Sequence, residues 1–353
     1  MSSGVDGKTE EVKAAVRGNM EARASRAELL SYFRQMLMIR RFEEKTAEMY
    51  KKAKIGGYCH LNLGEEASIV GALSTLDSRD YIYTNYREHG YALARGMAPG
   101  AIMAELFGKE DGCSKGRGGS MHLFDNNLHF MGGYGIVGGQ LPLATGAGFA
   151  LTYKGEDGVV IAQMGDGATA IGAFHESLNL AKLWNLPVIF LVINNLYGMG
   201  TPVEKSSAVP ELYRRARAYD MYAERVDGND VLAVRDAMQR AVRLAREDKE
   251  PSLIELMSFR MKGHSVVDPD RYRTNEEKRY YAEHDPIQAY EEQLIAEGIL
   301  TPEMIETTEA EIEREVESAV EFAEKSAFPK PEDLFQFMYA TSVPNAVLEV
   351  KTY

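Results

Sequence analysis

The sequence has few cysteines, no long apolar run and a shortage of basic residues. Its only two cysteines, Cys59 and Cys113, form neither a C-x-x-C pair nor a metal-ligand spacing. This argues against a disulfide framework and favours two free thiols in a reducing compartment. No stretch approaches the roughly 18 apolar residues of a membrane-spanning helix. The net charge of −13 argues against nucleic acid or an anionic membrane as the main partner, because both attract basic surfaces.

The 353 residues are enough for one large globular domain. We divide them into a flexible polar segment over 1–24, a folded domain over 25–330 and a C-terminal tail over 331–353. The N-terminal stretch is acidic and lacks the basic and apolar regions of a signal peptide, so we expect a cytoplasmic protein. The tail either docks on a partner or closes over its own domain, and the sequence favours neither.

Helix and strand patterns alternate through the middle of the chain. Apolar strands over 158–164 and 186–194 flank a helix over 171–184, and Ser25 with Glu28 forms a capping box ahead of an earlier helix. Further helices are expected over 64–76, 99–108, 210–219, 230–248 and from 302, and further strands over 80–86, 222–226 and 251–260. This alternation predicts an α/β fold, a parallel sheet flanked by helices.

A glycine-dense stretch over 112–148 interrupts this alternation. It is too long and too rich in glycine for one regular element. Embedded apolar residues argue against free disorder. We therefore expect a loop whose backbone approaches a ligand closely.

The run "VVIAQMGDGATA" contains Gly165, Asp166, Gly167 and then Ala170, which matches the G-x-G-x-x-A pattern of dinucleotide-binding loops. A nicotinamide site also needs an acidic residue about 20 positions later, to bind a ribose. The next strand supplies none. An unpaired carboxylate moreover repels a diphosphate in a low-dielectric pocket. A bridging divalent cation removes that repulsion, and Mg²⁺ prefers carboxylate, amide and backbone oxygens.

Such oxygen ligands follow the neighbouring strand. Asn194 and Asn195 close the apolar strand that comes one strand-helix-strand unit after Asp166, and Asn195 lies 29 positions beyond it. Adjacent parallel strands place their C-terminal ends side by side, where open sheets bind ligands. We therefore expect Asp166, Asn195 and a nearby backbone carbonyl to meet at one magnesium ion.

G-D-G followed after about 30 residues by N-N resembles the metal and diphosphate motif of thiamine diphosphate enzymes. The wider chain resembles the alpha subunits of the decarboxylating component of 2-oxo acid dehydrogenase complexes, of the pyruvate type. The resemblance runs from about residue 26 to about residue 290. The matching segments, in order, are YCHLNLGEEA, YTNYREHGYALARG, GCSKGRGGSMHLF, GGYGIVGGQLPLATG, MGDGA, NNLYGMGTPVE, VDGND and KGHSVVDPDRYRT.

The resemblance implies a set of binding residues for thiamine diphosphate and Mg²⁺. The implied metal ligands are Asp166, Asn195 and the carbonyl of Tyr197. The other implied cofactor contacts are Gly165, Gly167 and Ala168 around the diphosphate, Tyr86, Arg87 and Arg260 on phosphate oxygens, Gly135 and Val137 at the aminopyrimidine, and His264. The arginines would offset the phosphate charge, which the acidic protein as a whole does not attract.

The same resemblance places His60 near the substrate and His264 beside the reacting carbon, as the two candidate catalytic residues. Histidine exchanges a proton near neutral pH, and functional histidines often lie in loops such as the one that holds His264. Without the resemblance, the sequence favours a solvated loop residue for His264, and His60 could equally be a turn or core residue. The chain departs from the family at Ala170 and Ile171, where a polar pair is common.

The family's alpha subunits act on pyruvate together with a beta subunit, which supplies the glutamate that activates the aminopyrimidine. The resemblance therefore implies an alpha2beta2 heterotetramer that passes an acetyl group to a lipoyl group on a dihydrolipoyl acyltransferase core. Three alternatives stay open: the alpha subunit of a branched-chain 2-oxo acid or acetoin dehydrogenase, a half-transketolase that transfers a two-carbon sugar unit, and a non-catalytic subunit that only supports its partner.

Overall fold

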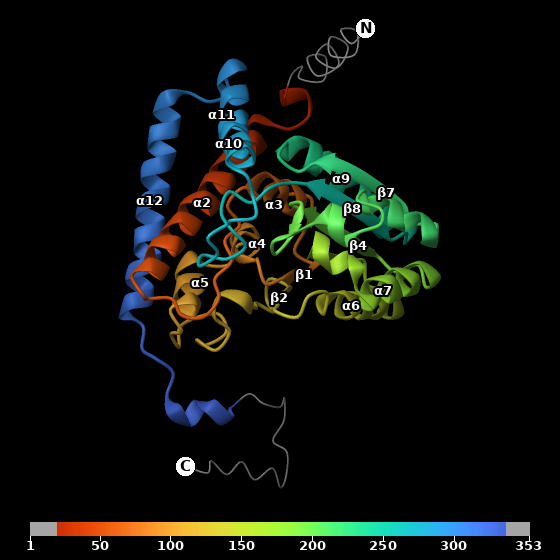
Figure 1. Cartoon of the computed structure of the whole chain (residues 1–353), viewed down its shortest axis with the longest axis horizontal. Coiled ribbons are helices and arrows are strands. Elements are labelled where there is room, and N and C mark those ends of the chain that lie inside the picture. Colours follow the sequence, from red (N-terminus) through yellow and green to blue (C-terminus); the bar gives the residue numbers. More distant parts are fainter. Residues whose placement is uncertain (1–19, 337–353) are drawn as a thin grey trace.

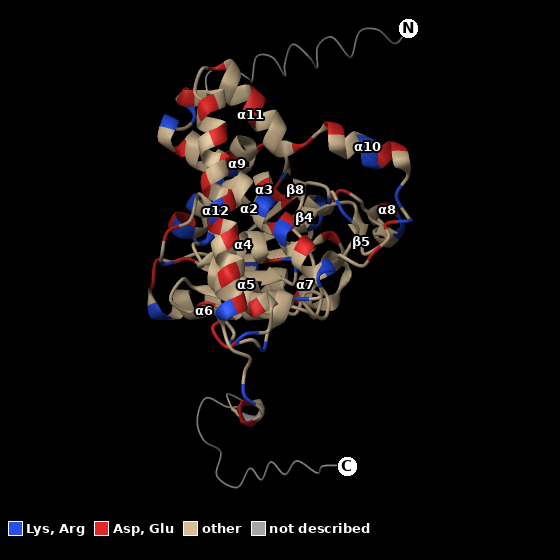
Figure 2. Cartoon of the chain, turned by 90° about the vertical axis from the view of Figure 1, so that its left-hand side faces the viewer, with Lys and Arg blue, Asp and Glu red and all other residues tan. Residues whose placement is uncertain are grey.

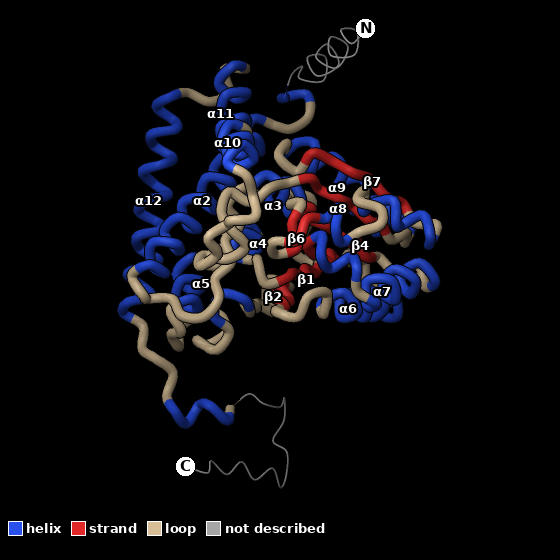
Figure 3. The backbone as a smooth tube through the Cα atoms, viewed as in Figure 1, coloured by secondary structure: helices blue, strands red, loops and turns tan. Residues whose placement is uncertain are grey.

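The computed structural model describes residues 20–336. Its centre is a six-stranded parallel sheet with the strand order β2-β1-β3-β4-β8-β7 (Figure 1). The strands are β1 (Tyr81–Asn85), β2 (Phe130–Tyr134), β3 (Val160–Gly165), β4 (Val188–Asn194), β7 (Tyr222–Asp227) and β8 (Ser252–Met257). Helices cover both faces of this sheet (Figure 3). The predicted α/β fold is confirmed.

The side chains of β4 point alternately to the two faces of the sheet and contribute to two apolar clusters. Ile189 and Leu191 belong to one apolar cluster, whereas Val188 and Phe190 belong to the other. Every residue of β4 is buried, as expected of an apolar strand that is covered on both faces. The first cluster includes residues of α2 (Arg26–Lys51), α3 (Glu66–Leu73), α4 (His89–Ala94), α5 (Pro99–Leu106), α9 (Val231–Arg243), α11 (Pro286–Ala296) and α12 (Pro302–Lys325). The second includes residues of α6 (Gln140–Lys154), α7 (Gly172–Leu183) and the 3₁₀ segment η4 (Leu212–Tyr219).

The capping box predicted at the start of α2 is present. The hydroxyl of Ser25 accepts a hydrogen bond from the backbone N–H of Glu28, and the carboxylate of Glu28 accepts one from the N–H of Ser25. These bonds satisfy backbone donors that a helix start otherwise leaves unpaired.

We expect Ser25→Ala to lower the free energy of unfolding by about 1 kcal/mol, because it removes this cap. Urea denaturation of the purified chain measures the change. Ser31→Ala, at an exposed position within α2, serves as control and should stay within about 0.5 kcal/mol of the unmodified chain. Equal effects of the two substitutions would contradict the capping role.

The glycine-dense stretch is more regular than the sequence predicts. In place of one loop over 112–148, the structure forms the edge strand β2 and most of helix α6. The helix needs glycine because it packs tightly on the sheet: a Cβ on Gly148 would lie only 2.5 Å from Cγ2 of Val188. Glycine that permits close packing looks the same in the sequence as glycine that permits a turn, which is why the prediction of a loop is wrong here.

The remaining elements depart from the prediction in detail. The expected helix over 210–219 is the 3₁₀ segment η4, and the helix expected over 230–248 is α-helical only in α9 and ends in a π turn at Leu244–Asp248. Two short strands, β5 (Tyr197–Gly198) and β6 (Thr201–Pro202), form an unpredicted antiparallel hairpin. The other short elements are η1 (Met20–Ala22), η2 (Gly119–Met121), η3 (Asp166–Ala170), α8 (Val203–Ser206), α10 (Asn275–Glu283) and η6 (Pro331–Phe335).

Both expected terminal segments lie mainly outside the described residues, namely the parts over 1–19 and 337–353. Met20 is buried, and its N–H donates to the carboxylate of Glu297 at 2.8 Å. Met20 therefore packs against the fold, although it falls in the segment over 1–24 that is expected to be flexible. Acidic side chains recur along α12 (Figure 2). Across residues 20–336, every helix is too short or too polar to span a membrane.

Candidate active site

The predicted site residues follow the C-terminal ends of neighbouring strands. Strand β1 pairs with β2 on one side and with β3 on the other, so the chain connections diverge at this strand. Open α/β sheets bind ligands at such a switch point. Tyr86 and Arg87 follow β1, Asp166 follows β3, and Asn195 follows β4. Arg260 lies just beyond β8, and its charge acts on both Tyr86 and Asp166.

The loop after β3 forms the 3₁₀ turn η3, in which Thr169 Oγ1 donates to the carbonyl of Asp166 at 2.7 Å. The hairpin of β5 and β6 lies beside it: a Cβ on Gly198 would be 3.7 Å from Asp166 Oδ2 and 3.6 Å from the Cα of Gly167. Asp166 therefore lies next to the strand that contains Tyr197. The turn and the residue before it include the three predicted diphosphate contacts, Gly165, Gly167 and Ala168.

Two buried oxygens in this site have no hydrogen-bond partner. They are Oδ2 of Asp166 and Oδ1 of Asn195. The amide nitrogen of Asn195 donates to Glu65 Oε1 at 3.0 Å, which fixes the amide and leaves its oxygen as the unpaired atom. Burial raises the pKa of Asp166 to about 6. A buried carboxylate oxygen without a partner is costly, and a cation bound to this oxygen and to Oδ1 of Asn195 removes that cost.

The donor set fits a hard cation such as Mg²⁺, which takes carboxylate, amide and carbonyl oxygens. Within residues 20–336 there is no group of three or more His, Cys, Asp and Glu placed to hold a metal. The metal-ligand set predicted from the sequence is not such a cluster, because it combines one carboxylate, that of Asp166, with an amide and a main-chain carbonyl.

The two arginines of the site differ in what they contact. The guanidinium of Arg87 donates to the carbonyls of Leu61 and His264, at 2.7 and 2.8 Å, and so ties two loops together. Arg260 donates to the carbonyl of Met199 at 2.9 Å, while its Nε is buried without a partner. Arg260 thus has a donor available for an anion, whereas the phosphate contact expected of Arg87 stays a prediction.

The two candidate catalytic residues, His60 and His264, lie together. Their ring centroids are 5.0 Å apart, and the ring of Tyr86 lies 4.5 Å from His60 and 5.7 Å from His264. Arg260 Nη1 lies 2.9 Å from Nδ1 of His264. Because a guanidinium only donates, Nδ1 is the acceptor, and the proton of the neutral ring is on Nε2. His264 therefore has an N–H available to a bound molecule.

Both histidines should be neutral at physiological pH. Burial and the positive charge of Arg87 lower the pKa of His60 to about 2 and that of His264 to about 4. Each folded-state pKa lies below the ordinary value of 6.5. The neutral rings therefore cost no stability above pH 6.5, and stability falls as the pH drops from 6.5 because the unfolded chain takes up the protons.

We expect the imidazole resonances of His60 and His264 to stay constant between pH 5 and 8 in an NMR titration of the histidine-labelled chain. Free imidazole added to the sample provides the internal reference for a group that titrates. Resonances are assigned by loss in the His60→Gln and His264→Gln variants. A midpoint above pH 6 for either residue would contradict the burial that sets these pKa values.

The predicted aminopyrimidine contacts follow β2 at the edge of the sheet. Val137 is 46% exposed and Ile136 is 79% exposed, so this segment leaves apolar surface uncovered. A Cβ on Gly135 would lie 3.5 Å from Cε1 of His122. Ile171 packs against this segment, since a Cβ on Gly138 would lie 2.0 Å from its Cδ1. The apolar side chain at the position where the family often has a polar one thus contacts the loop after β2.

Comparison with known sequences decides the family. The sequence profile of a family described as "Dehydrogenase E1 component" matches residues 34–332. The chain belongs to the dehydrogenase E1 component family. The family predicted from the ordered motifs is therefore confirmed.

Three curated relatives of this dehydrogenase E1 chain have names that begin with "Pyruvate dehydrogenase E1 component subunit alpha". The chain is 42% identical over 319 residues to the protein of Rhizobium meliloti, an alignment that covers 90% of this chain and 92% of the relative. It is 44% identical over 314 residues to that of Zymomonas mobilis, covering 88% of each. It is 41% identical over 319 residues to the testis-specific mitochondrial form of Homo sapiens, covering 90% of this chain and 81% of the relative.

The structure of this dehydrogenase E1 chain also shows site residues that the sequence did not identify. Glu65 is 2% exposed and accepts from the amides of both Asn195 and Asn62, each at 3.0 Å. The hydroxyl of Tyr272 accepts a hydrogen bond from Nη2 of Arg260 at 3.1 Å. These residues orient the predicted ligands from distant parts of the chain, and no local spacing marks such partners.

Proposed function

We propose that this chain is the alpha subunit of a pyruvate dehydrogenase, which decarboxylates pyruvate and transfers the acetyl group to a lipoyl group. The observation that carries the proposal is the pair of unpaired buried oxygens on Asp166 and Asn195, in a chain of the dehydrogenase E1 component family. The names of its curated relatives support pyruvate as the substrate.

Thiamine diphosphate, when bound, supplies the carbon nucleophile and the electron sink for decarboxylation. We propose that Asp166, Asn195 and the Tyr197 carbonyl hold its Mg²⁺, and that the unpaired Nε of Arg260 donates to a phosphate oxygen. Tyr86 and Arg87 are proposed as further phosphate contacts. Gly165, Gly167 and Ala168 line the diphosphate, and Gly135 and Val137 the aminopyrimidine.

The histidines define the protein's part in the chemistry. His264 donates its Nε2–H as a hydrogen bond to an oxygen of pyruvate and so stabilises the negative charge that develops there. Arg260 holds Nδ1 of His264 as the acceptor throughout. His60, buried beside Tyr86, closes the substrate side and excludes water.

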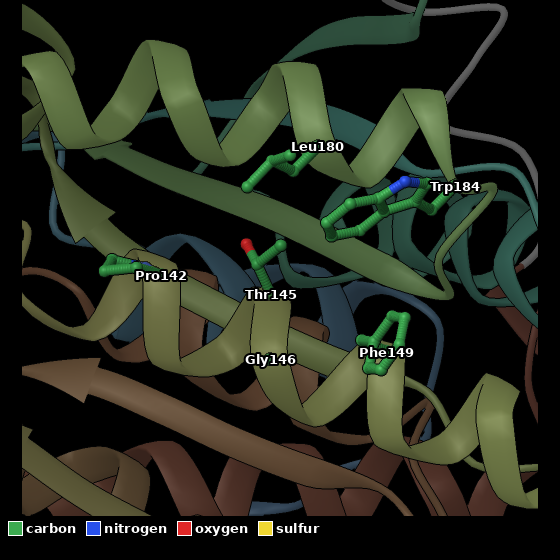
Figure 4. Close-up of a pocket in the computed structure, with 6 residues that line it drawn as sticks. All are labelled: Pro142, Thr145, Gly146, Phe149, Leu180 and Trp184. Atoms are coloured by element: carbon green, nitrogen blue, oxygen red, sulfur yellow. The ribbon is translucent and has the colours of Figure 1, made fainter.

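A beta subunit is the proposed partner, in an alpha2beta2 heterotetramer. The beta subunit would supply the glutamate that activates the aminopyrimidine. The lipoyl-bearing acyltransferase core would accept the acetyl group from the heterotetramer. Apolar side chains exposed on α6 and just after α7 favour such a partner: Phe149 and Trp184 are each 46% exposed. They border a groove of about 280 Å³ between the two helices (Figure 4). An uncovered apolar face of this kind marks an interaction surface.

We expect Trp184→Glu to weaken association with the beta subunit at least tenfold, because it places a charge in an apolar interface. Sedimentation of alpha and beta mixtures at several concentrations measures the effect. Ala310→Glu, at an exposed position on α12, adds the same charge on the other side of the molecule (Figure 1). Equal association constants for the two variants would show that this face is not the interface.

We also propose a cytoplasmic location, which the two free cysteines, Cys59 and Cys113, favour. Relatives with organelle names exist: the protein of Oryza sativa is named chloroplastic and that of Homo sapiens mitochondrial. Fractionation of the source cells, with this chain detected by antibody, decides the location.

The enzymatic test uses this chain with its beta partner, thiamine diphosphate, Mg²⁺ and an artificial electron acceptor. We expect CO₂ release from pyruvate. The kcat/KM for pyruvate should exceed the kcat/KM for a branched-chain 2-oxo acid and the kcat/KM for acetoin. Ketol transfer between sugar phosphates without CO₂ release would contradict the proposal. Full activity of the beta chain alone would assign this chain a supporting role only.

A further inference from the structure

The carboxylate of Glu105 is enclosed by backbone N–H groups. Glu105 lies in the last turn of α5 and is completely buried. Its Oε2 accepts from the N–H groups of Ser114 and Gly116 at 2.8 and 2.9 Å. Its Oε1 accepts from those of Gly118 and Gly119 at 2.7 and 3.1 Å. All four donors belong to one short loop that follows α5.

These four bonds determine the path of the loop, residues 112–119. An ionised carboxylate accepts about four hydrogen bonds, so the loop fills the capacity of Glu105. Backbone N–H groups that converge on an anion form a nest, and bonds to a charged acceptor are roughly twice as strong as neutral ones. The loop therefore takes its shape from one side chain.

The glycines of the loop are required by this arrangement. A Cβ on Gly112 would lie 2.3 Å from Glu105 Oε2. Gly116 has a φ of +72°, and a Cβ there would lie 2.7 Å from the carbonyl of Gly108. A Cβ on Gly118 would lie 2.2 Å from the carbonyl oxygen of His122. The chain is glycine-rich here because it wraps closely around a carboxylate.

The loop leads directly into the candidate active site. Ser120, the next residue, has its hydroxyl 2.9 Å from Nε2 of His89, and this hydroxyl accepts from the N–H of His60 at 3.4 Å. Two residues later, Nδ1 of His122 lies 2.9 Å from the carbonyl of Gly133. A Cβ on Gly135 would lie 3.5 Å from Cε1 of the His122 ring, so the loop reaches both the substrate side and the predicted aminopyrimidine side.

We propose that Glu105 is a positioning residue for the decarboxylation. It touches neither substrate nor cofactor, and it acts by holding the 112–119 loop so that Ser120 sets the backbone of His60 and His122 sets the segment at Gly135. This inference rests on the proposed function for its kinetic consequence. Its structural consequence, the placement of the loop, is independent of the substrate.

The test compares Glu105→Gln with two other variants. An amide presents N–H groups where the loop needs acceptors, so two of the four bonds are replaced by donor–donor contacts. Gly118→Ala disturbs the same loop without altering the carboxylate, through the clash with the His122 carbonyl. Glu110→Gln is the control, because Glu110 is exposed and its side chain takes no part in these bonds.

The structural measurements use the full chain in its folded state. In Glu105→Gln and Gly118→Ala, we expect trypsin to cut after Lys115 or Arg117 at least ten times faster, and the imidazole resonances of His60 and His122 to move. With the beta subunit and saturating thiamine diphosphate, we expect KM for pyruvate to rise and kcat/KM to fall at least tenfold. Glu110→Gln should match the unmodified chain in every measurement.

A lower melting temperature in Glu105→Gln, with trypsin rates, histidine resonances and KM all unchanged, would make Glu105 merely structural and overturn the proposal. If Glu105→Gln does not fold, Gly118→Ala carries the same expectations, and unmodified behaviour there would also overturn it. Absence of pyruvate turnover in the unmodified complex would contradict the proposed function alone, since the trypsin and NMR results still decide the loop.

Discussion

Replacement of Asp166 by alanine is expected to abolish magnesium-dependent binding of thiamine diphosphate. Asp166 is the only carboxylate in the predicted ligand set, and its buried Oδ2 has no partner within the chain. Loss of a residue that merely supports a metal ligand already costs about 10- to 100-fold in affinity. Removal of a charged ligand should therefore weaken binding by at least about 100-fold, as measured by titration calorimetry with Mg²⁺ present.

The same substitution should not destabilise the chain in the absence of cofactor. The carboxylate is buried and its pKa is raised to about 6, so its removal relieves a desolvation cost. Asp227→Ala, at an exposed position at the end of β7, is the matched control and should bind the cofactor normally. Near-normal affinity in Asp166→Ala would show that the metal assignment is wrong. Loss of folding would contradict the account of its burial.

His264→Ala is expected to retain thiamine diphosphate and to slow transfer of the acetyl group. The side chain offers an Nε2–H to the substrate while Arg260 occupies its Nδ1, and it makes no metal contact in the proposed site. Loss of one such hydrogen-bond donor to a developing charge costs about 10²- to 10³-fold, so kcat should fall by about 100-fold or more. Reductive acetylation of a lipoyl domain measures the rate, and calorimetry measures the cofactor.

The control for this prediction is His284→Ala, which removes an exposed histidine from the end of α10. Its rate should equal that of the unmodified complex. A folded His264→Ala variant that binds no cofactor would assign the histidine a structural role. Unchanged acetyl transfer would remove it from the chemistry.

Most strands of the sheet could be predicted from the sequence, because the apolar pattern within each segment indicates a strand. The run that forms β4 is apolar throughout and is buried throughout, and the capping box at Ser25 is present as expected. The prediction failed in the stretch over 112–148, where β2 and α6 are regular elements rich in glycine. Glycine there serves close packing, as at Gly148, and packing partners lie far away in sequence.

Some residues of the candidate site could likewise be predicted from the sequence, and others could not. Asp166 and Asn195 could be paired from one strand-helix-strand spacing, because parallel strands bring their ends together. The unpaired oxygens of both residues support that pairing. Glu65 and Glu105 could not be found by spacing, since each acts through a fold-dependent hydrogen bond to Asn195 or to a glycine loop. Such supporting residues become visible only once the topology is known.

The most direct test of the cation site is the position of the metal itself. In crystals of the alpha–beta complex grown with thiamine diphosphate and Mn²⁺ in place of Mg²⁺, anomalous scattering locates the ion. We expect one peak at bonding distance, about 2.1 Å, from Asp166 Oδ2, Asn195 Oδ1 and the carbonyl of Tyr197. Bound thiamine diphosphate with its metal away from Asp166 and Asn195 would contradict the account.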